Sequence, residues 1–226
     1  MKAITYSLYD RMLDYNHILI CGTAGCGKST LIDGLMQSAL CRDPAPTFYL
    51  IDPKCVDLMQ YRKVKLVKQR VTENEDAVDL LNEVIKVMQQ RYDDMEKAEI
   101  KITNEPDIYV VVDEVADIIA THKKQVMPLL QRIAQKGRAA KIHLILATQV
   151  LLCGILGTEV RGNFDCIVAM RTATANQSRV ILGTSGAEKL PKHGSSYIIN
   201  PDDGIGRYKI PMIPEEEIKK SIEYWS

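Results

Sequence analysis

Residues 22–29 form a turn whose residue types suit the binding of phosphate. The stretch reads GTAGCGKS and fits the pattern G-x-x-x-x-G-K-[ST], between the apolar run HILIC and a helical pattern. Glycines let successive backbone N–H groups point inward, and the helix that follows adds its positive N-terminal dipole. We therefore expect a site for ATP and Mg²⁺, with Lys28 at the β and γ phosphates, Ser29 on the metal and Thr30 near the α phosphate. The residues expected to contact the nucleotide are Gly22, Thr23, Ala24, Gly25, Cys26, Gly27, Lys28, Ser29 and Thr30. The alternative is a glycine-rich turn with a surface lysine.

A pair of acidic residues follows another apolar run, IYVVVDE at 108–114. A strand that ends in Asp113 would aim this carboxylate at the metal, and Glu114 would polarise the attacking water. Strands also often end in acidic loop residues with no such role. The agreement of this pair with the glycine-rich turn favours hydrolysis of a nucleoside triphosphate.

Other polar residues flank the run IHLILAT at 142–148. Gln149 follows it at the edge where open α/β sheets bind ligands, so this amide would sense the γ phosphate or the water. An ordinary strand-end amide is the alternative. Arg132 and Arg138 precede the run; arginine stabilises a transferring phosphoryl group, although an exposed arginine more often lies only in solvent. His143 is expected to be a hydrogen-bonded core residue.

The order of the predicted elements indicates an α/β fold. Apolar runs suited to a parallel sheet alternate with helical patterns, so helices should cover both faces of a mainly parallel sheet. Strands are expected at 17–21, 47–52, 108–114, 142–148 and 166–172, and helices at 28–40, 74–98 and 122–138. A late hairpin is expected over SYIIN, PDDG and RYKIPMI, and a terminal helix in PEEEIKKSIEYWS. We expect residues 1–226 to form one domain.

The amino-acid composition indicates a cellular compartment but does not identify a binding partner. Lys plus Arg and Asp plus Glu both number 29, so net charge predicts no ligand. The apolar runs are much shorter than the about 20 residues that span a bilayer, and the N-terminus lacks the apolar segment of a signal peptide. The six cysteines form no C-x-x-C pair, which favours reduced thiols in the cytoplasm.

Several segments together resemble the motor domain of the FtsK/SpoIIIE family, in the FtsK–HerA group of RecA-like P-loop ATPases. They are HILICGTAGCGKS, FYLIDPK, VVVDEVADI, RIAQKGRAAKIHLILATQ and SRVILGTSGAEKL. The resemblance implies a ring, usually a hexamer, with ATP between subunits and DNA threaded through the centre. It also implies that Arg138 is the trans-acting arginine finger, which leaves Arg132 as the lesser candidate.

The chain departs from the family at particular positions. Cys26 stands where a serine or a similar small residue is common, so nucleotide binding should survive but oxidation should inhibit turnover. Of the basic positions that the family directs toward DNA, Arg161 and Arg179 remain, whereas Val150 and Ala175 replace the others. We therefore expect weaker DNA binding with a shallower salt dependence of the affinity. The expected partner is double-stranded DNA, with single-stranded DNA as the alternative.

The resemblance covers the motor alone. We expect a free-standing DNA translocase that obtains its targeting from a partner such as a relaxase or a replication initiator. A coupling or secretion-type ATPase, which moves a protein or nucleoprotein, is the alternative. A nucleotide-binding switch is a third interpretation, but a water-orienting Glu114 favours repeated turnover instead.

Overall fold

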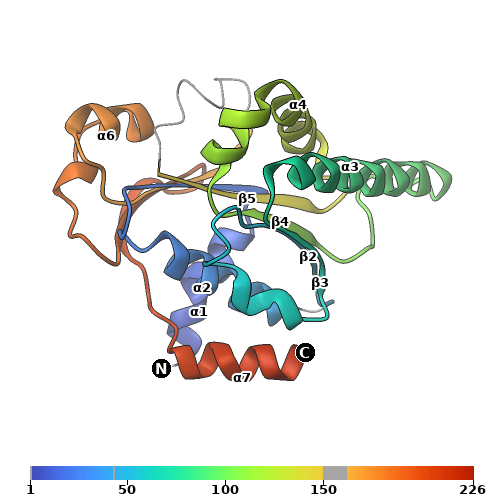
Figure 1. Ribbon diagram of the computed structural model, residues 1–226, viewed down its shortest axis with the longest axis horizontal. Helices are drawn as coiled ribbons and strands as arrows, with labels where there is room; N and C mark the ends of the chain where they lie inside the picture. The colour runs from blue at the N-terminus through green and yellow to red at the C-terminus, as the bar shows by residue number, and fades with distance from the viewer. Residues whose placement is uncertain (1, 43, 150–161) are drawn as a thin grey trace.

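Eight strands of the described chain make one mixed sheet, in the order β3-β2-β4-β5-β1-β6-β7-β8 (Figure 1). The computed structural model describes residues 2–42, 44–149 and 162–226, with side chains from residue 7 onward. Neighbours from β3 to β6 are parallel, and β7 and β8 add an antiparallel hairpin. The strands are β1 (His17–Cys21), β2 (Thr47–Ile51), β3 (Val67–Val71), β4 (Ile108–Val112), β5 (Ile142–Thr148), β6 (Cys166–Ala169), β7 (Ser195–Asn200) and β8 (Gly204–Lys209). The predicted α/β class is confirmed.

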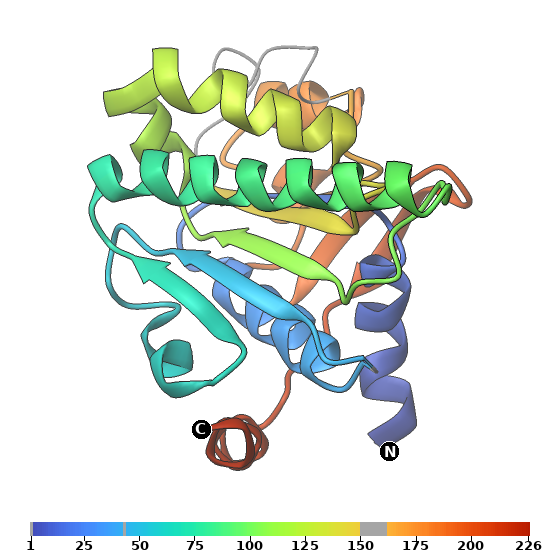
Figure 2. The ribbon, with the colours of Figure 1, turned by 90° about the vertical axis from the view of Figure 1, so that its right-hand side faces the viewer.

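Helices cover both faces of this sheet (Figure 2). One layer contains α3 (Asn74–Lys97), α4 (Val115–Lys136) and α6 (Ala175–Leu182); the other contains α1 (Lys2–Leu13), α2 (Lys28–Leu40) and α7 (Glu215–Trp225). Successive residues of a strand point to opposite faces, so Val110 and Val112 enter one core while Tyr109 and Val111 enter the other. Burial on both faces explains why the central strands are apolar throughout.

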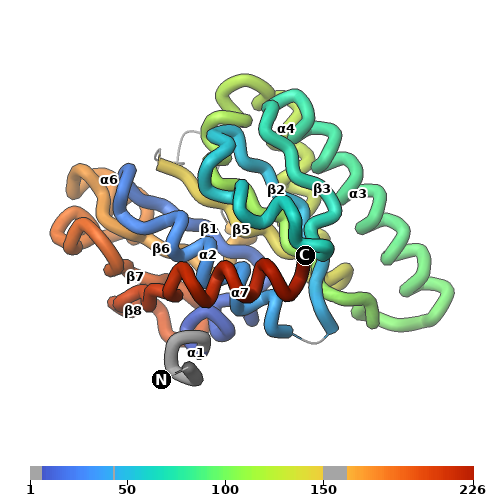
Figure 3. Tube along the Cα trace, turned by 60° about the horizontal axis from the view of Figure 1, so that its bottom comes forward, coloured from blue at the N-terminus to red at the C-terminus, as the bar shows by residue number. Residues whose placement is uncertain are grey.

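The last helix packs across the α2 face and brings the C-terminus close to the β2–β3 connection (Figure 3). That connection contains the short 3₁₀ helix η1 (Met59–Lys63), and a second one, η3 (Ala187–Lys189), precedes β7. The backbone N–H of Lys65 donates to the carbonyl of Trp225 at 2.8 Å. None of the helices in the described ranges is both long enough and apolar enough to cross a membrane.

Some predicted boundaries were wrong. Helix α4 begins at Val115 rather than at 122, because Val115, Ala116, Ile118 and Ile119 already form a buried helical face before non-helical dihedrals at His122. Strand β4 ends at Val112 and β6 at Ala169, so the polar residues beyond them lie in loops. The predictions missed α1, α6 and β3. β3 is an edge strand that carries Lys68 and Arg70, so it lacks the continuous apolar run of a central strand.

Candidate nucleotide-binding site

The strand order brings the predicted chemical groups to one edge of the sheet. β4, β5 and β1 are parallel neighbours, so the residues after their carboxyl ends lie side by side. A cavity of about 440 Å³ opens at this edge. Its lining consists of Ala24, Gly25, Gly27, Lys28, Ser29, Thr30, Lys54, Asp57, Asp113, Gln149 and His193. Most of the residues predicted to contact the nucleotide therefore share one cavity.

The glycine-rich turn, residues 22–27, has a backbone that only glycine adopts readily. Gly25 and Gly27 have positive φ angles of 68° and 107°, and Gly27 precedes the first residue of α2. The turn is fastened at its start, where the N–H of Thr23 donates to the carbonyl of Arg171 at 2.9 Å. A Cβ on Gly22 would lie 2.6 Å from Cys26 Sγ, so no larger residue fits there.

Lys28 lies within the curl of this turn. Its side chain is buried, and its Nζ donates to the carbonyls of Gly22 at 3.0 Å and Thr23 at 3.1 Å. Ser29 and Thr30 follow on the first turn of α2 and line the same cavity. The ammonium and the helix N-terminus thus concentrate positive potential at one point, as phosphate binding requires.

Cys26 faces away from the cavity and into the core. It is 1% exposed, and its thiol lies 3.8 Å from Met170 Sδ. Burial raises the pKa of this thiol, which disfavours the thiolate that reacts with peroxide. The structure therefore argues against the expected sensitivity of Cys26 to oxidation, while its backbone stays within the turn.

Asp113 presents a buried oxygen to the metal side of the cavity. The residue is 2% exposed, and its Oδ2 has no hydrogen-bond donor in the described chain. Burial, and then the nearby carboxylate of Asp57, raise the pKa of Asp113 to about 7. A hard cation held between Asp113 and the hydroxyl of Ser29 would supply the missing partner and favour the charged carboxylate. These residues fit Mg²⁺.

Glu114 is held by donors from the neighbouring strand β5. One carboxylate oxygen accepts from the hydroxyl of Thr148 at 2.7 Å, and the backbone N–H of Gln149 donates to both oxygens at 3.0 and 3.1 Å. The residue is 3% exposed. These contacts hold the carboxylate next to the backbone of Gln149, a residue that lines the cavity.

Sequence reasoning missed Lys54, Asp57 and His193. Lys54 follows β2, and the strand order places it beside Asp113 and Glu114. Its signal was present in the segment FYLIDPK, because a lysine just after a parallel strand lies at the ligand-binding edge. Asp57 and His193 come from loops with no motif of their own, and only the folded chain brings them to the cavity.

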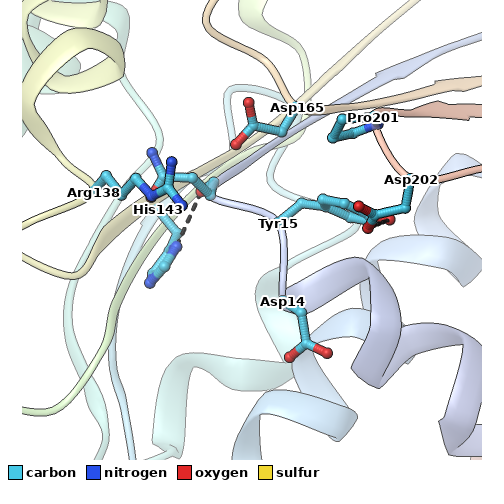
Figure 4. A pocket seen from close by; sticks show the side chains of 8 residues that line it. Asp14, Tyr15, Arg138, His143, Asp165, Pro201 and Asp202 are labelled. Atoms are coloured by element: carbon cyan, nitrogen blue, oxygen red, sulfur yellow. Dashed lines mark hydrogen bonds between the residues drawn. The ribbon is translucent and has the colours of Figure 1, made fainter.

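Arg138 lies at the opposite edge of the sheet, beside a second cavity of about 500 Å³ (Figure 4). It precedes β5, whereas Gln149 follows this strand of 7 residues, so about 23 Å of strand separates them. Arg138 is exposed and has no ion-pair partner within the described ranges. The cavity is also lined by Asp14, Tyr15, Asn16, His143, Asp165, Pro201 and Asp202.

A tight turn fixes the position of Arg138. A Cβ on Gly137 would lie 2.4 Å from the carbonyl oxygen of Ile142, so glycine is required where α4 turns into β5. His143 bonds to the carbonyl of Asn16 at 3.0 Å and to Asp107 at 2.8 Å, as expected of a structural histidine. Arg132 lines neither cavity; it lies on the exposed side of α4, 3.5 Å from Gln89 Oε1.

The residues predicted to bind DNA are only partly described. Arg179 is exposed on α6, where its guanidinium donates to Asn176 Oδ1 at 3.0 Å. Arg161 and the substituted position Val150 lie outside the described residues. The structure thus places Arg179 on the surface, and the DNA contact predicted for it stays a prediction.

Comparisons with known proteins found a matching family model, similar sequences and similar folds. The family model described as FtsK/SpoIIIE family matches residues 3–103 and 95–152. A DNA translocase FtsK of Helicobacter pylori strain J99 is 33% identical in an alignment of 225 positions that covers 92% of this chain. The chain spans 27% of the length of that relative.

Solved structures share the fold at lower identity. The pCW3 conjugation coupling protein TcpA, in a monomer form with ATPγS, superposes with a TM-score of 0.81 at 18% identity, over 94% of this chain and 65% of TcpA. The cytoplasmic domain of the type VII secretion ATPase EccC from Thermomonospora curvata gives 0.79 at 22% identity, over 93% and 28% of the two chains. At these identities the likeness concerns the fold.

Proposed function

Because this chain is a P-loop ATPase that belongs to the FtsK/SpoIIIE family, we propose that it is the motor of an ATP-driven DNA translocase. Identical subunits form a ring, most simply a hexamer, and hydrolyse ATP at the contacts between them to move DNA through the pore. The observation that carries this proposal is the placement of Arg138. It lies one full strand length from the cavity that holds Lys28, so it serves the cavity of a neighbouring subunit.

Each group at the cavity has a role in the proposed hydrolysis. The turn from Gly22 to Gly27 cradles the phosphates of ATP, and Lys28 binds the β and γ phosphates. Ser29 and Asp113 hold Mg²⁺, which neutralises phosphate charge when bound. Glu114 orients and deprotonates the attacking water, and Gln149 contacts the γ phosphate or that water. Arg138 of the adjacent subunit stabilises the charge that develops on the transferring phosphoryl group.

A coupling or secretion-type ATPase is the second candidate. The similarity of fold to the coupling protein TcpA and the secretion ATPase EccC favours it. The two candidates share the chemistry of ATP hydrolysis and differ in the polymer that stimulates it. DNA remains the first choice because the relative at 33% identity is named a DNA translocase.

The decisive experiment measures ATP turnover alone, with duplex DNA and with single-stranded DNA, together with the mass of the particle in solution. Strong stimulation by DNA and a mass of several subunits in the presence of ATP support the proposal. Stimulation by a protein substrate alone would instead support the coupling or secretion candidate. A chain that stays monomeric and hydrolyses ATP at full speed would contradict the ring.

The role proposed for Arg179 has its own test. If this guanidinium pairs with a DNA phosphate, Arg179→Ala weakens binding to all sequences alike and reduces the salt slope of the affinity by about one. Arg62→Ala is the matched control, because Arg62 is also exposed but lies on η1 in the opposite helix layer. Equal salt slopes for both variants would remove Arg179 from the DNA interface.

A further inference from the structure

Lys54 is a cation at the nucleotide cavity to which the proposed function gives no role. It follows β2 in a short turn, where the N–H of Cys55 donates to the carbonyl of Asp52 at 3.0 Å and Cys55 has a positive φ of 57°. The Asp52 carboxylate is fully buried and accepts from Arg70 at 2.7 Å and from the N–H of Leu58 at 3.2 Å. This buried network makes the turn a fixed base for a long side chain.

The ammonium of Lys54 lies beside the acidic pair, and Lys54 also lines the cavity. Its Nζ is 3.2 Å from Glu114 Oε2 and 4.0 Å from Asp113 Oδ2, while its side chain is 35% exposed. Both carboxylates are nearly fully buried. The flexible stem of a lysine lets its charge move by several ångström without a change of backbone.

The ammonium of Lys54 can pair either with Glu114 or with an anionic ligand in the cavity. Three donors, from Thr148, Gln149 and Lys54, satisfy the Glu114 carboxylate, and Glu114 does not line the cavity that Asp113, Lys54 and Lys28 line. While these three donors hold the carboxylate, its oxygens are directed at Thr148, Gln149 and Lys54 rather than at a water in the cavity.

We propose that Lys54 recognises the γ phosphate and exchanges its pairing with Glu114 for pairing with that phosphate. The terminal phosphate of ATP carries more charge than a single carboxylate and offers several acceptor oxygens to one ammonium. The exchange releases Glu114 toward the water only when ATP is bound; with ADP, Lys54 stays on Glu114. Lys54 thus distinguishes ATP from ADP and links this distinction to the base. The proposal rests on the proposed function in one respect, that the cavity holds ATP.

The test compares nucleotide affinities by calorimetry in the presence of Mg²⁺, using ADP and the non-hydrolysable analogue AMPPNP. Lys54→Met should weaken AMPPNP binding roughly tenfold, since a charged hydrogen bond is lost, and leave ADP affinity nearly unchanged. Lys54→Arg, which keeps the charge, should recover most of the preference. Lys63→Met is the matched control, because Lys63 is exposed on η1 and lines no part of this cavity.

If Lys54→Met leaves the ratio of the AMPPNP and ADP affinities unchanged, the proposal is overturned. A lysine with a purely structural role would affect both nucleotides equally. If Lys54→Met lowers the melting temperature, Lys54→Gln gives the same ratio with a neutral side chain that keeps a donor. The calorimetric assay contains no DNA, so it tests the role of Lys54 separately from the translocase. If DNA fails to stimulate ATP turnover in the other experiment, that result contradicts only the proposed translocase. A wild-type chain that binds neither nucleotide overturns the site itself.

Discussion

The two edges of the sheet differ in whether their basic side chains are paired within the chain. At the carboxyl edge, Lys28 and Lys54 both have partners within the same subunit, and the backbone of the glycine-rich turn is fastened to neighbouring strands. At the amino edge, Arg138 is exposed beside a cavity of about 500 Å³ and lacks an ion-pair partner within the described ranges. This difference supports the proposal that the first edge binds a ligand by itself and that another molecule completes the second.

The largest expected effect comes from the incomplete edge. Arg138→Ala should lower the turnover of the assembled protein on the order of 10³-fold, since arginine fingers contribute at least that much, while ADP affinity stays unchanged. Arg132→Ala, on the exposed side of α4, is the control and should retain turnover. Steady-state phosphate release measures the turnover, and calorimetry measures the ADP affinity. If Arg138→Ala keeps the wild-type turnover, Arg138 does not complete a nucleotide site, and the proposed difference between the two edges is wrong.

Mixing variants sharpens the same point. In a particle that mixes Arg138→Ala and Glu114→Gln subunits, some interfaces contain a complete site. At such an interface the Arg138→Ala subunit supplies Glu114, and its neighbour supplies Arg138. Mixed particles should therefore recover part of the wild-type turnover, although neither variant alone is active. Recovery shows that the two edges act on the same ATP from different subunits.

At the complete edge, Lys28→Ala should remove productive nucleotide binding. The variant loses the phosphate clamp and leaves the carbonyls of Gly22 and Thr23 without this donor. We expect turnover to fall by roughly 10²–10³ and ATP affinity to fall with it, unlike the effect at Arg138. Calorimetric titration with ATP measures the loss. Lys220→Ala, at an exposed site on α7, should bind as the wild type does.

Glu114→Gln should separate binding from chemistry. The amide retains the shape of the carboxylate but not its ability to take a proton, so turnover should fall by about 10² while ATP stays bound. A single-turnover assay with radiolabelled ATP detects the trapped nucleotide. Rapid release of unhydrolysed ATP by this variant would show that Glu114 contributes mainly to binding.

The smallest expected effect concerns stability at the amino edge. Burial, and then His143, lower the pKa of His17 to about 3, so the unfolded chain binds a proton here more readily than the folded one. The stabilising contribution is complete above pH 6.5 and is lost as the pH falls toward 3, at about 1.4 kcal/mol per pH unit. Urea unfolding at pH 7 and pH 5 should show a loss of about 2 kcal/mol.

A matched pair of histidine variants tests this pH dependence. His17→Asn should reduce the difference between pH 7 and pH 5, because no buried imidazole remains to exclude a proton. His193→Asn, altered at an exposed residue of the opposite edge, should keep the wild-type difference. The same pH dependence in both variants would assign the acid sensitivity to other groups.

Much of the fold followed from local pattern. β1, α2 and β5 were predicted with the boundaries that the structure gives, because each combines a continuous apolar pattern with a clear start or end. The edge strand β3 and the first turns of α4 were missed. An edge strand with exposed polar residues has little apolar periodicity, and a kink at His122 divides the helical pattern of α4 in two.

The sequence by itself determined the types of chemical group in this protein: a phosphate-binding turn, an acidic pair and a set of arginines. These signals are local, because a turn or a strand end is fixed by a few consecutive residues. The tertiary structure alone decided which groups share a cavity. The strand order joined Lys54 to Glu114 from positions far apart in the chain. Such a contact depends on the lateral pairing of parallel strands, which no short stretch of sequence specifies, whereas the separation of Arg138 from Gln149 follows from the length of β5 alone.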